Sequence, residues 1–369
     1  MTGVTVGAPK TQTRPRPIRS VKASLGWLRD NLFNTWYNSL LTLGSVWLLY
    51  KIFITVVPWA LTRAVFGTTP ESCEGAQGAC WSFVHHFFGL FLVGTYPYDQ
   101  RWRILGVAMI VVALSVATLY RPWRWKRWLL LAWVASLFPV FLMIRGSTTL
   151  GLEVVDSTQW GGLMLTILLS VFGIGLAFPF SILLAMGRRS KLPVIKALCV
   201  GYIELIRGVP LITILFMASV MLPLFFPSGF TLDKVLRAQI GIMLFSSAYL
   251  AEVVRGGLQA IPRGQEEAAA AMGLNYWQIM GLIVMPQALR IVIPPLVSTF
   301  IGLLKDTSLV AIISLIDLLG AAYSASQNPD WLGHVVEAYV FTGAVYWVIC
   351  FSMSRYSQGL EQRFRVGQQ

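Results

Sequence analysis

The sequence predicts an all-α polytopic membrane protein with about eight transmembrane helices. Apolar residues make up 56% of the 369-residue chain and charged residues only 12%, whereas soluble chains carry about 25% charged residues. Long apolar runs recur along the chain, with short Lys and Arg clusters between them. One aqueous core cannot hide so much apolar surface, so most of it must face a lipid bilayer. The net charge of +13 does not indicate nucleic-acid binding, because no basic-aromatic platform or helix-turn-helix pattern accompanies it.

Residues 1–35 are expected to form a basic cytoplasmic tail. This segment is rich in Pro, Lys and Arg and lacks the early apolar core of a cleavable signal peptide. Its composition also suits a transit peptide, but the long bacterial-type membrane domain favours the tail.

A transmembrane helix needs about 20 mostly apolar residues. The segments that qualify are 36–61, 104–120, 128–144, 161–186, 194–226, 235–254, 291–325 and 335–353. The fifth and the seventh are long and contain prolines or charges, so each is predicted to be broken or tilted. A shorter apolar segment, 81–96, is predicted to be interfacial or re-entrant rather than spanning.

The charges of the loops predict the orientation. Basic clusters fall on alternate loops, and the opposite loops carry mostly acids, namely Glu71, Glu74, Glu153, Asp156 and Asp330. By the positive-inside tendency, both termini are expected in the cytoplasm of a bacterium, with the chain in its inner membrane. With eight spans rather than nine, the basic clusters stay on the cytoplasmic side throughout the chain.

The predicted spans and loops place the four cysteines in two groups. Cys73 and Cys80 fall in the first outer loop, where an oxidising compartment allows a disulfide, although two free thiols remain the alternative. Cys199 and Cys350 lie in or near spans and are expected to be small packing residues.

A polar, Ala-rich segment at 262–286 interrupts the apolar pattern. Pro262 and Gly264 should precede a short helix, because four alanines in a row have high helix propensity and Glu266 and Glu267 favour a helix N-terminus. Gly273 suits the left-handed residue that ends a helix. Further along, Asn275 and Gln278 resemble a capping box, and Pro286 suits the start of the next span. The segment therefore predicts two short cytoplasmic helices joined at a glycine, although an ordinary surface loop is the simpler alternative.

The spacing within this segment resembles the EAA motif of the permease subunits of ABC importers. Glu267-Ala268-Ala269 is followed by Gly273 and then by Ile283, Met285 and Pro286; only Met285 departs from the pattern, where the family has Leu. The resemblance implies that Glu266, Glu267, Ala268, Ala269, Gly273 and Pro286 form a coupling helix seated on a cytoplasmic ATPase subunit.

Flanking stretches narrow the resemblance. GYIELIRGVPLI from Gly201, SSAYLAEVVRGGLQAIPRGQEEAA from Ser246 and LLKDTSLVAIISLIDL from Leu303 resemble the polar amino-acid uptake permeases. The similarity covers 159–365, and the chain is most similar to the larger permease of general L-amino-acid importers. It implies a five-helix permease core at 151–369, preceded by accessory helices and an outer loop at 36–150. It also implies three kinds of partner: a dimer of ATP-binding subunits that holds ATP and Mg, a second homologous permease, and a periplasmic amino-acid-binding protein.

Motifs for catalysis are missing from the sequence. No G-x-x-x-x-G-K-[ST] loop is present, so energy from ATP must enter through another subunit. No G-x-S-x-G elbow occurs, and His85, His86 and His334 are too scattered to indicate a metal site. We therefore expect neither an enzyme nor a metal or cofactor in this chain.

Ionisable residues inside the membrane domain are costly and need a partner or a cavity. Glu204 with Arg207, and Glu252 with Arg255, are three apart and are expected to form structural pairs, with a gating role as the lesser alternative. Gly208 and Pro210 should bend the helix that follows the first pair.

A second group of polar residues lies in the seventh span, at Lys305, Asp306, Thr307 and Ser308. An amino-acid zwitterion needs a cation and an anion, and transporters place such groups at broken helices. The group is therefore a candidate substrate pathway, with an interhelical clamp to Asp317 or Glu204 as an equal alternative.

These observations together predict a permease subunit of an ATP-driven L-amino-acid importer that works by alternating access. A self-contained ion-coupled transporter is the alternative, but it should show an inverted repeat of broken helices, and none is evident. A non-transporting scaffold would have no use for an ATPase docking motif.

Overall fold

The computed structural model describes residues 21–120, 125–227 and 232–365. These residues form helices and connecting loops, with two isolated β-bridges, Ser147 to Leu152 and Gly162 to Asp317. The predicted basic tail lies outside the described residues as far as residue 20. The chain divides into two compact units, one of residues 1–65 and 75–79 and one of residues 66–74 and 80–369.

The first unit contains α1 (Val21–Leu32) and α2 (Trp36–Val57), and a π-helical turn, η1 (Pro58–Thr62), continues α2. Thr35 caps α2 by accepting a hydrogen bond from the Asn38 backbone N–H. The segment Trp36–Thr62 is long and apolar enough to cross a membrane. No residue of α2 is buried within the protein, so its apolar surface is available to lipid on all sides, as expected for the first predicted span.

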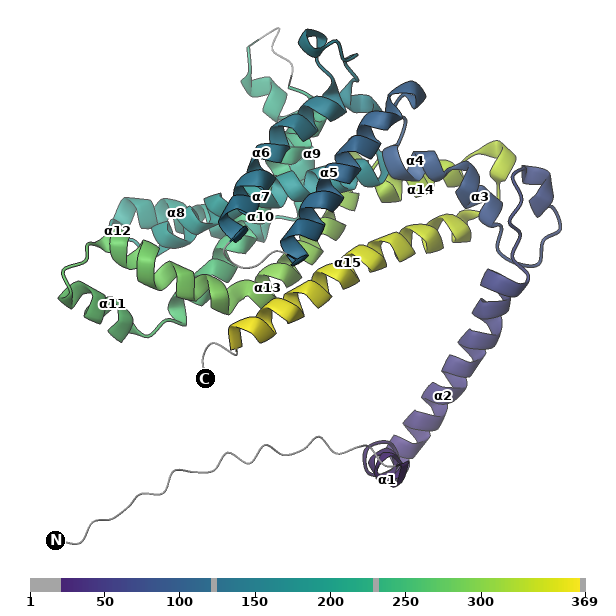
Figure 1. The fold of residues 1–369 in the computed structure, drawn as a ribbon, viewed down its shortest axis with the longest axis horizontal. Coiled ribbons are helices and arrows are strands. Elements are labelled where there is room, and N and C mark those ends of the chain that lie inside the picture. Colours follow the sequence, from purple (N-terminus) through teal and green to yellow (C-terminus); the bar gives the residue numbers. More distant parts are fainter. Residues whose placement is uncertain (1–20, 121–124, 228–231, 366–369) are drawn as a thin grey trace. The chain divides into compact units, whose positions relative to one another are not determined.

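The second unit holds the other helices (Figure 1). Those not tied to the site described below are α3 (Trp81–His86), α4 (Phe88–Val93), α5 (Arg101–Tyr120), α6 (Lys126–Arg145), α9 (Leu211–Val220), α14 (Leu318–Ser326) and α15 (Val335–Arg365). The helices around the site are α7 (Gly162–Arg188), α8 (Pro193–Gly208), α10 (Lys234–Gln259), α11 (Arg263–Ala271), α12 (Tyr276–Gln278) and α13 (Met285–Asp306).

Length and apolar composition qualify six segments of the described chain as spans, and a seventh if the bent pair α8 and α9 counts as one. That pair bends by 103° between Gly208 and Leu211, where Pro210 starts α9, so the predicted break in the fifth span is confirmed. The remaining predicted span, 235–254, corresponds to α10. This helix carries too many polar residues to qualify by composition, because protein rather than lipid surrounds much of it: fourteen of its residues are buried.

The core of the second unit forms around α7 and α10, which pack along one another, and α8, α9 and α13 pack onto α10 (Figure 1). Small residues at the contacts allow the backbones of these helices to approach closely. A Cβ at Gly257 would lie 2.8 Å from the Ala288 carbonyl oxygen, so α10 and α13 approach at a point where only glycine fits. The start of α5 and the end of α6 join the same core through Ile104, Val140 and Ile144. Residues of α5 and α6 therefore pack in the same core as the later helices. The domain boundary at residue 150 stays a prediction.

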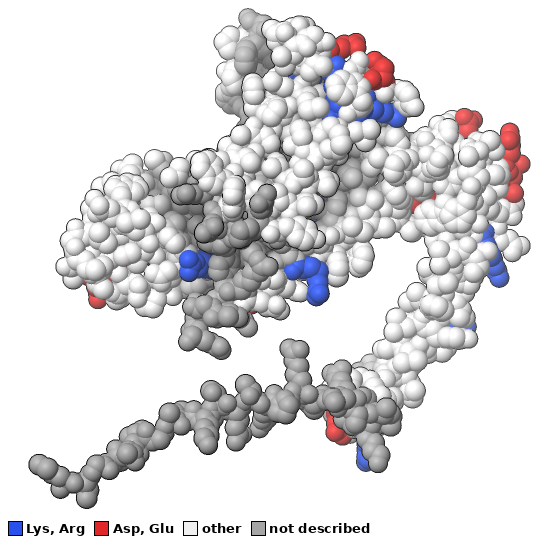
Figure 2. Space-filling view, in the orientation of Figure 1, with Lys and Arg blue, Asp and Glu red and all other residues white. Residues whose placement is uncertain are grey.

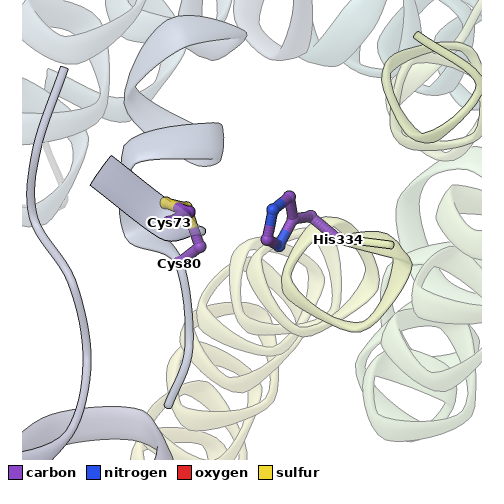
Figure 3. A group of neighbouring side chains, drawn as sticks. All are labelled: Cys73, Cys80 and His334. Carbon is purple, nitrogen blue, oxygen red and sulfur yellow. A yellow bond between two sulfur atoms is a disulfide. The ribbon is translucent and has the colours of Figure 1, made fainter. Parts of the chain in front are cut away.

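The short segment 81–96 does not span: it forms α3 and α4, with Phe83 and Phe91 fully buried. A disulfide joins Cys73 to Cys80 just before α3, which confirms the first of the two alternatives for these cysteines. The His334 ring faces this disulfide (Figure 3), and its nitrogen lies within 4.8 Å of both sulfurs. No sequence pattern indicated that His334 would lie near these cysteines. Because the two sulfurs are bonded to each other, neither is available as a thiolate ligand.

Candidate functional site

The Ala-rich segment forms α11, which begins directly after Pro262. The helix ends at a left-handed glycine: Gly273 has φ +81°, and its N–H donates to the Ala270 carbonyl at 2.9 Å. The next N–H, that of Leu274, donates to the Ala269 carbonyl at 3.3 Å. These bonds satisfy carbonyls at the helix end, and they confirm the role expected for Gly273.

The predicted capping box is also present, but the helix that it starts is longer than expected. The Gln278 N–H donates to Asn275 Oδ1 at 3.0 Å, and the Asn275 N–H donates to Gln278 Oε1 at 2.9 Å. From there α12, a π-helical turn η8 (Ile279–Val284) and α13 follow without a break. Pro286 lies in the first turn of α13, as expected, but the prediction that the second short helix is separate from that span is wrong. The wide π-turn changes the hydrogen-bond register just before Pro286, so the missing N–H of the proline does not stop the helix.

Arg189 holds α11 against the ends of two long helices. It directly follows α7; its Nη1 donates to the Leu258 carbonyl in α10 at 3.2 Å, and its Nη2 donates to Glu266 Oε1 in α11 at 2.9 Å. The Arg189 side chain therefore links α11 to the ends of α7 and α10. Glu266, one of the residues expected in the coupling helix, is paired with Arg189 within the chain.

The outer face of α11 and the turn after it remain exposed. Glu267 and Ala268 are exposed, and the large apolar side chains of Met272, Tyr276 and Trp277 are 70%, 50% and 72% exposed. Ala269, by contrast, is buried against the protein. Five neighbouring residues that join one carboxylate to exposed apolar surface are typical of a protein-docking surface. The sequence motif did not single out Met272, Tyr276 or Trp277.

A network of ion pairs lies at the same end of α7, α8 and α10. Arg188 donates to Glu204 Oε1 at 2.9 Å and to Glu252 Oε2 at 3.3 Å. Arg255 also pairs with Glu252, as expected, and Arg207 lies 3.9 Å from the same carboxylate. The expected pairing of Glu204 with Arg207 is therefore wrong: each side chain pairs with a residue of another helix, because helix packing brings a better-placed partner than the same-helix neighbour.

The candidate pathway residues lie where α13 changes into a 3-10 helix. Helix α13 ends at Asp306 and continues as η9 (Thr307–Ile313) within one long apolar segment, Tyr276–Ile313. The seventh predicted span is broken further on, at Ser314, which has φ +60°. Lys305 is exposed, while Asp306 and Ser308 are half-buried. Thr307 is buried, and its hydroxyl donates to the Leu304 carbonyl at 2.7 Å. In the described parts of the chain neither Lys305 nor Asp306 belongs to an ion pair.

The alternative of a clamp to Asp317 or Glu204 is wrong, because both carboxylates are engaged elsewhere. Asp317 is fully buried and caps α14 by accepting from the N–H groups of Leu319 and Gly320, and Tyr346 donates to it at 3.3 Å. Glu204 is held by Arg188. Neither carboxylate therefore forms an ion pair with Lys305 in the described chain.

A bundle in which six segments of the described chain are long and apolar enough to cross a membrane is the fold of an integral membrane protein. Most of the surface visible for the second unit in Figure 2 is uncharged, as a lipid-facing bundle requires. Residues 177–366 match the family model of the binding-protein-dependent transport system inner membrane component, and the chain belongs to this family. It is a multi-pass inner membrane protein.

Similar proteins extend the comparison beyond that domain. The inner membrane amino-acid ABC transporter permease protein YhdY of Escherichia coli strain K12 is 49% identical over 96% of both chains. The glutamate/glutamine/aspartate/asparagine transport system permease protein BztC of Rhodobacter capsulatus is 37% identical over 95% of this chain and 96% of its own. A crystal structure of an amino acid ABC transporter with histidines has a TM-score of 0.49 at 29% identity and covers 55% of this chain and 92% of its own. The two permease relatives, similar over nearly the whole chain, support the permease interpretation over the self-contained ion-coupled alternative.

Proposed function

We propose that the chain is the permease subunit of an ATP-driven importer of L-amino acids. Two relatives similar over nearly the whole chain carry names that assign them to amino-acid transport. The observation that carries the proposal is the exposed face of α11, held by Arg189 at the ends of α7 and α10. ATP is hydrolysed by a dimer of partner subunits that binds ATP and Mg, and α11 seats in a groove of one of them.

Coupling follows from how α11 is held. Glu267 would meet a basic group of the ATPase, while Met272 and Trp277 fill apolar parts of its groove, since their side chains are 70% and 72% exposed. When the ATPase subunits close, the force on α11 passes through Arg189 to α7 and α10. These two helices form the core of the second unit, so their tilt changes which side of the membrane the path opens to.

The substrate path runs past the junction of α13 and η9. Asp306 attracts the ammonium group of an amino acid and Lys305 its carboxylate, with Thr307 and Ser308 beside them. Their charges lack partners within the described chain, and unpaired ionisable groups in a membrane domain are typical of substrate pathways. A single permease provides half of such a path, so a second homologous permease completes it, and a periplasmic binding protein delivers the amino acid.

This proposal places α11 and both termini in the cytoplasm. The basic loops support that orientation through the positive-inside tendency. It leaves the disulfide between Cys73 and Cys80 on the periplasmic side, where such bonds persist.

The test is transport by the assembled complex in proteoliposomes. Uptake of labelled amino acids should require ATP on the α11 side and a binding protein on the other. Glu267→Arg should abolish ATPase association in co-purification, because the reversed charge meets a basic group. Glu71→Arg, a matched reversal of an exposed carboxylate in the outer loop, should leave association intact. Uptake driven by an ion gradient without ATP would overturn the proposal.

A further inference from the structure

A cavity of about 280 Å³ lies where α6 meets the first halves of α7 and α10. Both helices begin beside it and end beside α11, so the cavity lies at the opposite end of the bundle from the coupling site. Apolar side chains form most of its wall, among them Phe141 of α6 and Leu168, Phe172 and Leu176 of α7. Its polar lining is gathered toward the start of α7 and α10, at Arg145, Asp156, Ser157, Trp160, Asp233 and Gln239.

Two buried polar groups of this lining have no partner. Gln239 is 7% exposed, and neither its Nε2 nor its Oε1 forms a hydrogen bond; Trp160 is 5% exposed, and its Nε1 forms none either. A buried polar group without a partner is unfavourable, so natural proteins rarely leave three such atoms at one place. Two of the three atoms are N–H donors, which indicates an occupant that supplies oxygen acceptors.

The rim of the cavity adds a cation and an anion. Arg145 ends α6, and its guanidinium forms no ion pair or hydrogen bond with the rest of the described chain. Asp156 accepts from the Thr158 N–H at 2.8 Å and the Thr158 hydroxyl at 2.7 Å, both through Oδ1. These bonds, with a smaller contribution from the charge of Arg145, hold the pKa of Asp156 below its usual value, so the carboxylate is ionised at neutral pH.

The dimensions of the cavity exclude a small zwitterion as its full occupant. Leu168, Phe172 and Leu176 recur every fourth residue and form one stripe along α7, about 12 Å long at 1.5 Å per residue. Gln239 lies about 9 Å along α10 from Asp233 by the same measure. An amino acid is too short to reach the rim, Gln239 and the end of the stripe together. An amphiphile with a zwitterionic head, acceptor oxygens below it and a long apolar tail matches this order of groups.

We propose that this cavity binds one aminophospholipid of the phosphatidylethanolamine type from the leaflet on that side of the membrane. Its phosphate lies on Arg145 and the Trp160 N–H, and its ammonium group lies on Asp156. Gln239 Nε2 donates to an ester carbonyl, and an acyl chain follows Leu168, Phe172 and Leu176. Because α6 packs chiefly on α5, the lipid fills the seam between an accessory helix and the core and holds the two together.

Leu176→Trp tests the tail site, because the larger side chain fills the groove. The full-length chain is purified from membranes in mild detergent, and the phospholipid retained per chain is measured by mass spectrometry. The unmodified protein should retain one phosphatidylethanolamine, and the variant at least tenfold less. Leu183→Trp is the matched control: Leu183 lies two turns further along α7, is 63% exposed and does not line the cavity. This control should retain the lipid.

Variants of the residues that would contact the lipid head group test how the protein recognises it. In titrations with defined lipids, Asp156→Asn should lose the preference for phosphatidylethanolamine over phosphatidylglycerol, whereas Arg145→Gln should weaken both. Asp330→Asn, a change at another exposed carboxylate of a loop, should alter neither. Equal retention in the unmodified protein and Leu176→Trp would overturn the proposal. So would an amino acid that displaces the lipid, or a crosslink from Leu176→Cys to a second permease.

Discussion

Two charged regions of the molecule contrast in how their charges are satisfied. At the ends of α7, α8 and α10, Glu204, Glu252 and Glu266 all pair with arginines of other helices. At the end of α13, Lys305 and Asp306 form no ion pair within the described chain. Ion pairs within the chain hold helices in place, whereas charged groups without such partners are available to bind a ligand or another chain. The same contrast separates two neighbours on α11, since Glu266 is paired and Glu267 is exposed.

The sharpest test of this contrast is Asp306→Asn. If Asp306 binds the ammonium group of the substrate, the variant loses a charge-assisted hydrogen bond of about 1.5–3 kcal/mol. Uptake at low substrate concentration should then fall by about tenfold to about 100-fold. Initial rates of labelled amino-acid uptake into proteoliposomes measure the effect, normalised to the amount of assembled complex.

Asp330→Asn serves as the control, because Asp330 is an exposed carboxylate in a loop. Normal uptake by Asp306→Asn at normal assembly would remove Asp306 from the pathway. Loss of assembly together with uptake would instead assign it a contact with the second permease.

The paired region should respond in stability rather than in substrate recognition. Glu252→Gln leaves the arginines at positions 188, 207 and 255 facing one another without the carboxylate that they share. Hydrogen bonds to charged groups contribute about 1.5–3 kcal/mol, so the free energy of unfolding should fall by a similar amount. Titration with a denaturing detergent measures it.

Glu74→Gln, at an exposed carboxylate of the outer loop, should change stability by less than about 0.5 kcal/mol. Equal stability of Glu252→Gln and the unmodified chain would show that the network contributes nothing to holding α7, α8 and α10 together.

Local features of the site could be predicted from the sequence because neighbours in the chain determine them. Gly273 adopts its left-handed conformation and Asn275 and Gln278 cap each other through bonds that span three residues or fewer. The break at Gly208 and Pro210 is equally local. Spacing and residue type were sufficient for each of them.

Features that depend on helix rotation could not be predicted. Arg189 and Glu266 are 77 positions apart, and the partner of Glu204 lies on α7 rather than on its own helix. Burial of α10 on most sides depends on the packing of four other helices. Apolar periodicity therefore overlooked the polar residues that this helix hides, Gln239 among them.

Gly264 in α11 and Gly273 just after it should change the stability of this helix in opposite directions when each is replaced by alanine. Gly273 has φ +81°, where an L-residue costs about 1–2 kcal/mol, so Gly273→Ala should loosen the end of α11. Gly264 lies inside α11 with open space around it, so Gly264→Ala should stabilise the helix by about 0.5–1 kcal/mol. Amide hydrogen exchange across 263–274 measures both. Slower exchange in both variants would contradict a left-handed turn at Gly273.

The smallest effect is expected from exchanging the charges that hold α11 to α7. Arg189 and Glu266 are each 33% exposed in their side chains, and an exposed ion pair contributes about 0–1 kcal/mol. If the proposed coupling is right, Arg189→Glu alone should therefore lower ATP-driven uptake by about threefold, because two like charges then repel α11 while Glu267 stays free for the ATPase. Adding Glu266→Arg restores the attraction in reverse. The double variant should transport better than Arg189→Glu, although the bond from Arg189 to Leu258 is lost in both. A double variant no better than Arg189→Glu would mean that motion of α11 reaches the core by another route, most directly through the continuous helix from Asn275 into α13.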